Sequence, residues 1–228
     1  MTSEERLKEL VLSGIGSKPY NVQRVIGANM VADFVSCKLD VILVECDCEG
    51  KYTTGMQVSL LEKFPELKEQ VDAIPESART LGSIVPITVM RKHKNKRGVS
   101  TGFTLGYIVN VYTRKTSGWG MRRDRVMRKH DNFLMPVSHF YPEAITQALN
   151  SVFDFADSLV AAGLAKKHVN IACPRLCRGV GGSLWSDVET AILQAVDSHK
   201  KNIRVYLPRN PDNEIVQGDN SKLESGHV

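Results

Sequence analysis

The amino-acid sequence predicts a layered α/β domain with a mostly parallel or mixed sheet, and three observations support that prediction. Apolar runs alternate along the chain with segments whose apolar residues recur at helical spacing. Several of these runs are almost entirely apolar, as strands buried on both faces are. Two loops rich in glycine or small polar residues, 46–55 and 174–182, each join an apolar run to a helical segment. Such loops are where α/β proteins hold ligands.

The first half of the chain predicts one short helix, two strands and a second helix. Residues 3–13 have helical spacing, and GIGSKP interrupts them. Two apolar runs follow, VQRVIGANMVADF and LDVILVEC, and we expect each to be a buried strand. A helix then begins at Gly55, because Met56, Leu60 and Phe64 recur at helical spacing before Pro65 interrupts the run.

The second half of the chain predicts a hairpin, two helices and two further strands. SIVPITVM and TGFTLGYIVNVYTR read as strands joined by the basic turn RKHKNKRGVS. Residues 141–164 form an amphipathic helix, with Pro142 suited to its first turn and Gly163 near its end. HVNIACP and NIRVYLP are predicted strands on either side of a helix over 184–196.

These elements suggest how the chain is divided. We expect an N-terminal helix and linker over 1–20, and one domain over 21–208 with a basic surface insertion around 114–135. The last residues, 209–228, are polar and are expected to be disordered.

Composition narrows the class of protein. The chain has no run of about 18 uncharged apolar residues, so we expect no membrane span. Its five cysteines, with no secretory pattern at the start, predict reduced thiols and a cytoplasmic protein. The Cys46-x-Cys48 spacing is wrong for a zinc knuckle, so neither a metal nor another cofactor is expected.

Positive charge is concentrated in one part of the chain. The net charge is only +5, but residues 91–129 hold 12 of the 30 lysines and arginines. Such a concentration favours an anionic partner, and nucleic acid is one candidate. The alternative is that these residues form solvated loops that keep the protein soluble.

The two glycine-rich loops suggest a ligand with phosphate groups. Glycine at a strand-to-helix junction lets backbone N–H groups approach a phosphate, and the helix N-terminus adds partial positive charge. Both loops end where a helix begins, so the pair could hold the two phosphates of a diphosphate. Neither loop has the GxxxxGK[ST] sequence of a P-loop, and tight turns also need glycine.

The order of these elements resembles the macro domain, a module that binds ADP-ribose. Three stretches carry the resemblance: VADFVSCKLDVILVECDCEGKYTTGMQVSLLEKFP, YIVNVYTRK and IACPRLCRGVGGSLW. CDCEG and the Pro-Arg after the later strand are most similar to the branch of ADP-ribose-1″-phosphate phosphatases and terminal ADP-ribose protein glycohydrolases. The resemblance implies a three-layer α/β/α fold with a mixed central sheet, and ADP-ribose or an ADP-ribosylated substrate as the partner.

The resemblance also implies which residues bind the ligand. Asp33 falls where the family uses an Asp to accept hydrogen bonds from the adenine amino group; the alternative is a cap or turn Asp between two strands. Gly50, Thr54 and Gly55 would lie along the distal ribose and a phosphate. The second loop would hold the diphosphate through its backbone, at Arg178, Gly179, Val180, Gly181 and Gly182.

The catalytic residues of that branch are replaced in this chain. Arg114, with Lys115 beside it, stands where the glycohydrolases have a lysine nucleophile, and arginine has no free amine. Gly181 stands where those enzymes have an Asp, and Val44 where the phosphatases have a His. Asp47 and Lys115 are the remaining candidates for catalysis, unless Asp47 only caps its turn.

Three functions follow as alternatives. The first is binding and hydrolysis of ADP-ribose or a derivative, at a terminal phosphate or an ADP-ribosyl bond. The second is non-catalytic reading of ADP-ribose or ADP-ribosylated macromolecules, which the replaced catalytic residues favour. The third is nucleic-acid binding through residues 91–129, with the macro-like fold as a scaffold.

Overall fold

The computed structural model describes most of the chain between residues 21 and 208. Its described residues are 21–50, 52, 55–94, 100–115, 141–165, 167–177 and 185–208, with backbone alone at 92–94, 100 and 101. Several predictions fall outside these residues: the helix over 3–13, the insertion from 116 to 135, the tail over 209–228, Thr54 and the loop over 178–182.

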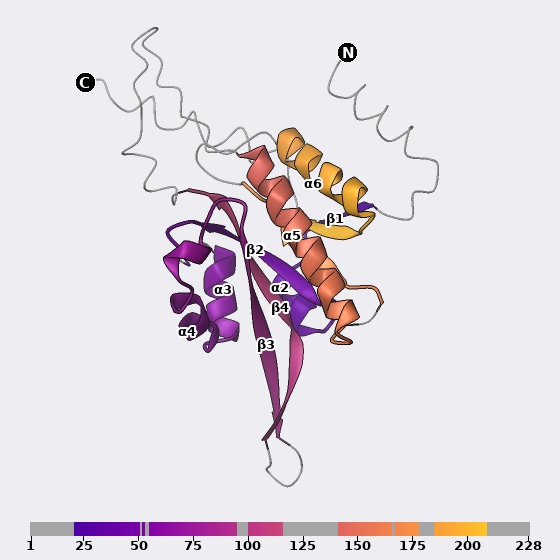
Figure 1. Ribbon diagram of the computed structural model, residues 1–228. Helices are drawn as coiled ribbons and strands as arrows, with labels where there is room; N and C mark the ends of the chain where they lie inside the picture. Colours follow the sequence, from indigo (N-terminus) through magenta and orange to yellow (C-terminus); the bar gives the residue numbers. More distant parts are fainter. Residues whose placement is uncertain are drawn as a thin grey trace, which may run out of the picture.

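A six-stranded mixed sheet forms the middle of the structure (Figure 1). The strand order is β1-β6-β5-β2-β4-β3; all neighbouring strands are parallel except β3, which is antiparallel to β4 at the edge. The strands are β1 (Val22–Ile26), β2 (Val41–Asp47), β3 (Ile84–Lys94), β4 (Ser100–Arg114), β5 (Ile171–Pro174) and β6 (Ile203–Leu207).

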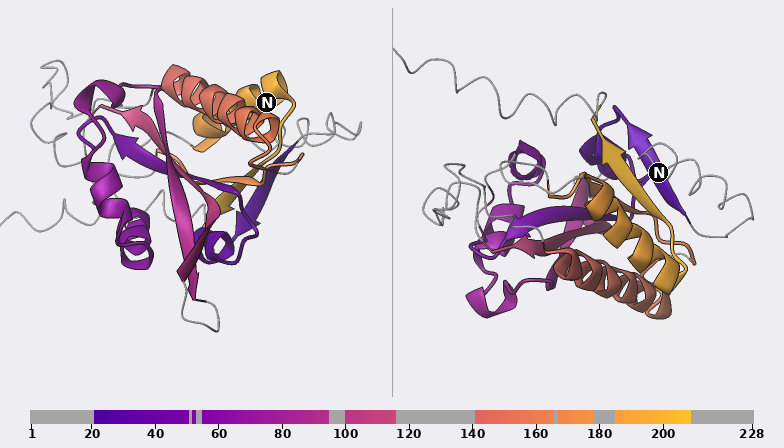
Figure 2. Two further views of the ribbon diagram at one scale, coloured as in Figure 1. Left: turned by 60° about the horizontal axis from the view of Figure 1, so that its bottom comes forward. Right: turned by 90° about the horizontal axis from the view of Figure 1, so that it is seen from above.

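Helices cover both faces of this sheet, which confirms the predicted three-layer α/β/α fold (Figure 2). One face packs against two long helices, α5 (Pro142–Ala161) and α6 (Trp185–His199). The other face packs against three shorter helices and one 3₁₀ turn: α2 (Met30–Val35), α3 (Gly55–Lys63), α4 (Leu67–Asp72) and Glu76–Ala78. No helix in the described ranges is long and apolar enough to cross a bilayer.

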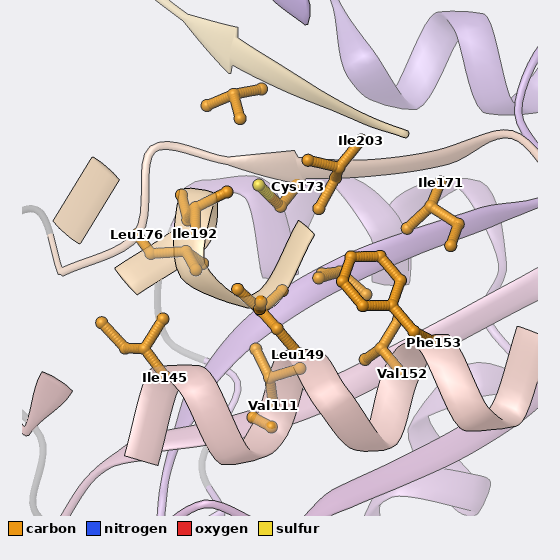
Figure 3. Close-up of a cluster of buried hydrophobic side chains, with 14 of the residues drawn as sticks. Val111, Ile145, Leu149, Val152, Phe153, Ile171, Cys173, Leu176, Ile192 and Ile203 are labelled. Atoms are coloured by element: carbon orange, nitrogen blue, oxygen red, sulfur yellow. The ribbon is translucent and has the colours of Figure 1, made fainter. Parts of the chain in front are cut away.

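The larger core lies beneath α5 and α6. Along α5 the buried residues recur every three or four positions, which is the spacing of one helix face: Ala144, Ile145, Ala148, Leu149, Val152, Phe153, Ala156 and Leu159. Figure 3 shows Leu149 and Phe153 directed towards Ile192 of α6 and Ile171 of β5. Each such large side chain contributes about 1.5–3 kcal/mol by leaving water.

The prediction of one long strand over VQRVIGANMVADF is wrong in its second half. β1 ends at Ile26, Gly27 takes a φ of 69°, and α2 begins three residues later. Asn29 is the N-cap of α2, because its side chain accepts a hydrogen bond from the Ala32 N–H at 3.1 Å. The apolar residues after Asn29 therefore bury one face of a short helix rather than both faces of a strand.

The predicted hairpin is confirmed, and it is longer than the rest of the sheet. β3 and β4 pair from Ile84↔Val111 to Lys94↔Ser100, whereas β2 pairs with β4 only from Tyr107 onwards. The two strands therefore extend beyond the sheet as an arm (Figure 1). The arm leaves at the amino end of β4, opposite to the edge where the parallel strands have their carboxyl ends.

Candidate functional site

A cleft of about 1220 Å³ lies at the carboxyl ends of the parallel strands. The turn between β1 and α2 and the first turn of α3 form two of its walls, and the ends of β2, β4, β5 and β6 form its base. This is the edge at which open α/β sheets bind ligands. The residues that matter for its chemistry are Asn29, Glu45, Gly55, Glu62, Arg114 and Arg175.

Arg114, Arg175 and Lys63 are the positively charged residues that line the cleft. Arg114 is the last residue of β4, and its side chain is 16% exposed. Arg175 directly follows β5, and its guanidinium lies 5.6 Å from the centre of the Trp185 ring at the start of α6. Guanidinium groups are fully charged and suit phosphate geometry, so the cleft is equipped to hold an anion.

Glu45 is the acidic residue at the base of the cleft, and its side chain is only 11% exposed. Both of its carboxylate oxygens accept from the backbone N–H of Cys177, each at 3.0 Å. Thr113 Oγ1 donates to Glu45 Oε1 at 2.9 Å, and Arg114 Nε lies 3.3 Å from the same oxygen. One carboxylate therefore joins β2, β4 and the segment after β5.

The sequence analysis did not select Glu45. A signal was present, because Glu45 is an acidic residue inside the otherwise apolar run VILVEC. A carboxylate in a buried strand needs partners, so it marks a place where other polar groups converge.

Cys177 begins the second glycine-rich loop in an unusual conformation. Its φ is 55°, in the left-handed region that non-glycine residues rarely adopt. Its N–H points to the Glu45 carboxylate. The predicted diphosphate ligands of this loop, residues 178–182, lie outside the described residues, so they stay a prediction.

Asp47 is the last residue of β2, where the following turn begins, and it is 4% exposed. Its Oδ1 accepts from the Gly50 N–H at 3.0 Å, and its main-chain carbonyl accepts from the same N–H at 3.0 Å. Burial raises the pKa of Asp47, and the hydrogen bond from Gly50 opposes that rise. These contacts are those of a turn-capping residue, the alternative that the sequence left open.

Gly50 packs against Arg79. Arg79 Nη1 donates to the Glu49 carbonyl at 3.0 Å, and Nη2 donates to the Ile74 carbonyl at 2.6 Å. A Cβ on Gly50 would lie 2.5 Å from Arg79 Nη1, and Gly50 has a φ of 73°. The positive φ and the nearby Arg79 side chain are each sufficient to explain why residue 50 is a glycine, so no bound ligand is needed to account for it.

Two hydrogen bonds from buried or half-buried side chains join the first glycine-rich loop and the start of α3 to the sheet. Tyr52 donates from its hydroxyl to Asn110 Oδ1, and burial raises the pKa of Tyr52. Gln57 of α3 is buried, and its Nε2 donates to the Glu45 carbonyl at 2.9 Å. The start of α3 is therefore tied to the end of β2.

Asp33 lies in the first turn of α2, where both of its oxygens have partners. Lys38 Nζ lies 2.9 Å from Oδ1, and the Tyr206 hydroxyl donates to Oδ2 at 2.7 Å. These two hydrogen bonds, that of Lys38 first, lower the pKa of Asp33. Lys115 follows β4 and is exposed, with its Nζ 5.6 Å from the centre of the Tyr141 ring.

The cleft brings together few of the predicted site residues. Gly55 lines it; among the described residues that do not line it are Asp33, Asp47, Gly50 and Lys115. Within the described part of the chain, no group of three or more His, Cys, Asp or Glu side chains could hold a metal ion.

Comparison with solved structures shows that the chain has the macrodomain fold. The macrodomain of Thermus aquaticus DarG matches with a TM-score of 0.52 at 18% identity, over 82% of this chain and 99% of that one. Thermosipho africanus DarTG in complex with ADP-ribose matches with a TM-score of 0.51 at 16% identity, over 82% of this chain and 42% of that one. A Bacteroides thetaiotaomicron protein of unknown function matches with a TM-score of 0.50 at 16% identity, over 82% and 98%.

The similarity is one of structure alone. No protein-family model matches the sequence, and no curated protein matches it at a significant level. The resemblance to macro domains is therefore confirmed for the fold.

Proposed function

We propose that this protein binds ADP-ribose or a close derivative in the cleft at the carboxyl ends of its parallel strands. The observation that carries the proposal is the pair of arginines, Arg114 and Arg175, in this cleft. Gly55 and Pro174, one from each of the two glycine-rich loops, also line it. The cleft exceeds the range of about 300–1,000 Å³ typical of small-molecule sites, so it can take a dinucleotide-sized ligand. The similar Thermosipho africanus DarTG structure is a complex with ADP-ribose.

The negative diphosphate is the part of the ligand that suits this cleft best. Gly55 begins α3 at the cleft wall, and a Cβ there would meet nothing within 4 Å, so the backbone is open to a ligand. The unpaired N–H groups of a helix's first turn favour an anion. We propose that residues 178–182 hold the diphosphate from the other side, as the sequence predicts.

Whether the bound ligand is hydrolysed is a separate proposal. Asp47 and Lys115 are the predicted catalytic groups, for a phosphatase or a glycohydrolase reaction. Asp47 is buried and accepts from the Gly50 N–H, and the Lys115 ammonium lies over the Tyr141 ring. These contacts favour the alternative of a non-catalytic reader, which we take as the better-supported form.

Calorimetric titration with ADP-ribose tests the proposal, with AMP as the control ligand. We expect wild-type protein to bind ADP-ribose but not AMP, and Arg175→Ala to bind it about 10-fold or more weakly, since the variant removes a charged hydrogen-bond donor from the cleft. Lys167→Ala removes one exposed positive charge outside the cleft and should bind as wild type does. A wild-type protein that binds no form of ADP-ribose would refute the proposal.

Turnover is measured next, on the same preparations. Incubation with ADP-ribose-1″-phosphate followed by a phosphate assay separates a phosphatase from a reader. Phosphate release by the wild-type protein would show that it is a phosphatase if Asp47→Asn or Lys115→Met abolishes the release and still binds the ligand. That result would refute the proposal of a non-catalytic reader.

As a second function, we propose that the basic residues 91–129 bind nucleic acid. The observation that favours it is the arm formed by β3 and β4, where Arg91 is followed by Lys92 and Lys94. Phe103, which pairs with Arg91, is 48% exposed, and an aromatic ring beside positive charge suits stacking on bases.

Salt-dependent binding of a labelled oligonucleotide tests this second function. Replacing Arg91, Lys92 and Lys94 with alanine should weaken binding and reduce its slope against log salt by roughly one for each phosphate that the variant no longer neutralises. The matched control replaces three lysines away from the arm, Lys68, Lys167 and Lys201. Equally weakened binding in both variants would indicate a net-charge effect and refute the arm as the site.

We also propose a reducing compartment, the cytoplasm, for this protein. All five cysteines are free thiols, and three of them are buried. Free buried thiols persist where glutathione and thioredoxin keep cysteines reduced.

A further inference from the structure

We infer that Glu45 is the positioning residue of the segment Arg175–Cys177 that follows β5, with Arg114 as its counter-ion. This inference rests on the proposed function, because Arg175 of this segment lines the cleft proposed to hold the ligand. The Glu45 carboxylate accepts from the Cys177 N–H and so holds the end of this segment. In the sequence, the glycines 179, 181 and 182 follow Cys177 closely.

The geometry joins three elements through a single side chain. The Cys177 N–H is shared between Oε1 and Oε2, and the nitrogen lies 3.0 Å from each oxygen. Both carboxylate oxygens therefore take part in holding Cys177. Thr113 and Arg114 approach Oε1 from β4, at 2.9 Å and 3.3 Å. Glu45 itself is fixed by its place on β2, in the middle of the sheet.

Stability alone does not explain a charged pair at this place. Burying a carboxylate is costly, and apolar residues of similar volume are often as stabilising as a buried ion pair. What an apolar residue cannot do is accept the Cys177 N–H and hold Cys177 at its φ of 55°. We therefore infer that the contact serves to position Cys177 more than to stabilise the domain.

Arg114 has a role in this arrangement that differs from the one suggested by the family resemblance. It stands where the similar glycohydrolases have a lysine nucleophile, yet its Nε forms an ion pair with Glu45 Oε1 at 3.3 Å, without a hydrogen bond between them. Its side chain lines the cleft and is 16% exposed. Arg114 thus neutralises Glu45 on the side where the anionic ligand is proposed to lie.

The test combines hydrogen exchange with ligand titration on Glu45→Ala and Glu45→Gln. The alanine variant removes the acceptor of the Cys177 N–H, whereas the glutamine variant keeps an acceptor oxygen and removes only the charge. Glu69→Gln is the matched control, because Glu69 is an exposed carboxylate on α4 that does not line the cleft. Exchange is measured at the Cys177 amide, and ADP-ribose affinity at a temperature where each variant is folded.

We expect faster exchange at Cys177 in Glu45→Ala and about 10- to 100-fold weaker ADP-ribose binding, the loss typical of a hydrogen bond to a charged group. Glu45→Gln should fall between Glu45→Ala and wild type, and Glu69→Gln should match wild type in both measurements. A purely structural role would lower the melting temperature without changing the affinity of the folded protein.

Two results would overturn the inference. One is unchanged exchange at Cys177 in both Glu45 variants, which would mean that Glu45 does not hold the loop. The other is faster exchange with ADP-ribose affinity unchanged, which would mean that the position of Cys177 does not matter for the ligand. If wild-type protein fails to bind ADP-ribose, the proposed function is refuted, and the exchange data still decide whether Glu45 holds the loop.

Discussion

Substituting alanine at Gly50 and at Gly55 separates the two reasons for glycine in the first glycine-rich loop. The sequence predicts both residues as ligand-binding, but their surroundings differ. Gly50 has a φ of 73° and lies against the Arg79 guanidinium, whereas a Cβ on Gly55 would meet nothing within 4 Å. We therefore expect Gly50→Ala to affect folding and Gly55→Ala to affect mainly the ligand.

The magnitude follows from two costs at Gly50. Holding a non-glycine residue in the left-handed region costs about 1–2 kcal/mol. The new Cβ would lie 2.5–2.7 Å from three guanidinium atoms of Arg79, so that group must move. It would then lose a hydrogen bond to the Glu49 or Ile74 carbonyl, and one such charged bond is worth about 1.5–3 kcal/mol. Together these predict about 2.5–5 kcal/mol of destabilisation.

Gly55→Ala should be close to wild type in stability. Gly55 is the first residue of α3, and alanine is preferred to glycine in a helix by up to about 1 kcal/mol. Urea unfolding followed by circular dichroism measures both variants, and calorimetry with ADP-ribose measures their affinities. We expect a loss of affinity for Gly55→Ala alone.

A double variant makes the reasoning refutable. Arg79→Ala removes the group that the Gly50 Cβ would meet, so combining the two changes should cost less than their separate effects added. If Gly50→Ala is as stable as Gly55→Ala, the account of Gly50 is wrong. If Gly50→Ala is folded but no longer binds ADP-ribose, Gly50 is a ligand residue, as the sequence predicts.

Three further predictions concern the rest of the described chain. Gly106→Ala should destabilise the protein by about 3 kcal/mol, because its Cβ would lie 2.6 Å from the main-chain carbonyl oxygen of Asp40; urea unfolding measures this. Iodoacetamide at pH 8 should modify the exposed Cys37 first, since burial raises the pKa of the other four thiols; peptide mass spectrometry would contradict this if another cysteine reacted first. The pKa of Asp33 is lowered, so its ion pair with Lys38 stabilises the fold above about pH 4 and this contribution is lost as the pH falls through the folded-state pKa. The destabilisation caused by Lys38→Met, measured by urea unfolding, should therefore be largest near pH 6 and decrease as the pH is lowered.

Most of the fold could be predicted from the sequence because its signals are local. The run LDVILVEC is apolar at nearly every position, as a strand in the middle of a covered sheet must be, and it forms β2. The long helix α5 follows from its spacing of apolar residues and from Pro142 at its start. The second half of VQRVIGANMVADF was predicted wrongly, because a six-residue helix shows less than two turns of its period. Its N-cap, Asn29, was the local signal available.

The candidate site was harder to predict because its contacts join distant residues. Glu45 and Cys177 are 132 positions apart, and no spacing rule connects them. Asp33 and Tyr206 are 173 positions apart, so the sequence could not show that the Asp33 carboxylate has a partner inside the protein. The sequence identified both glycine-rich loops, but the residues that hold them in place are set by the sheet topology.

The distribution of charge explains how acidic residues can lie beside a site for an anion. Carboxylates near a diphosphate would repel it if their charge were not balanced. Asp47 is buried and accepts from the Gly50 N–H, and the Glu45 carboxylate is occupied by the Cys177 N–H and by Arg114. A carboxylate whose charge is balanced inside the protein exerts little repulsion on a ligand outside it. Arg175, Lys63 and the first turn of α3 then supply the positive field in the cleft. The same contacts that neutralise Glu45 also hold Cys177.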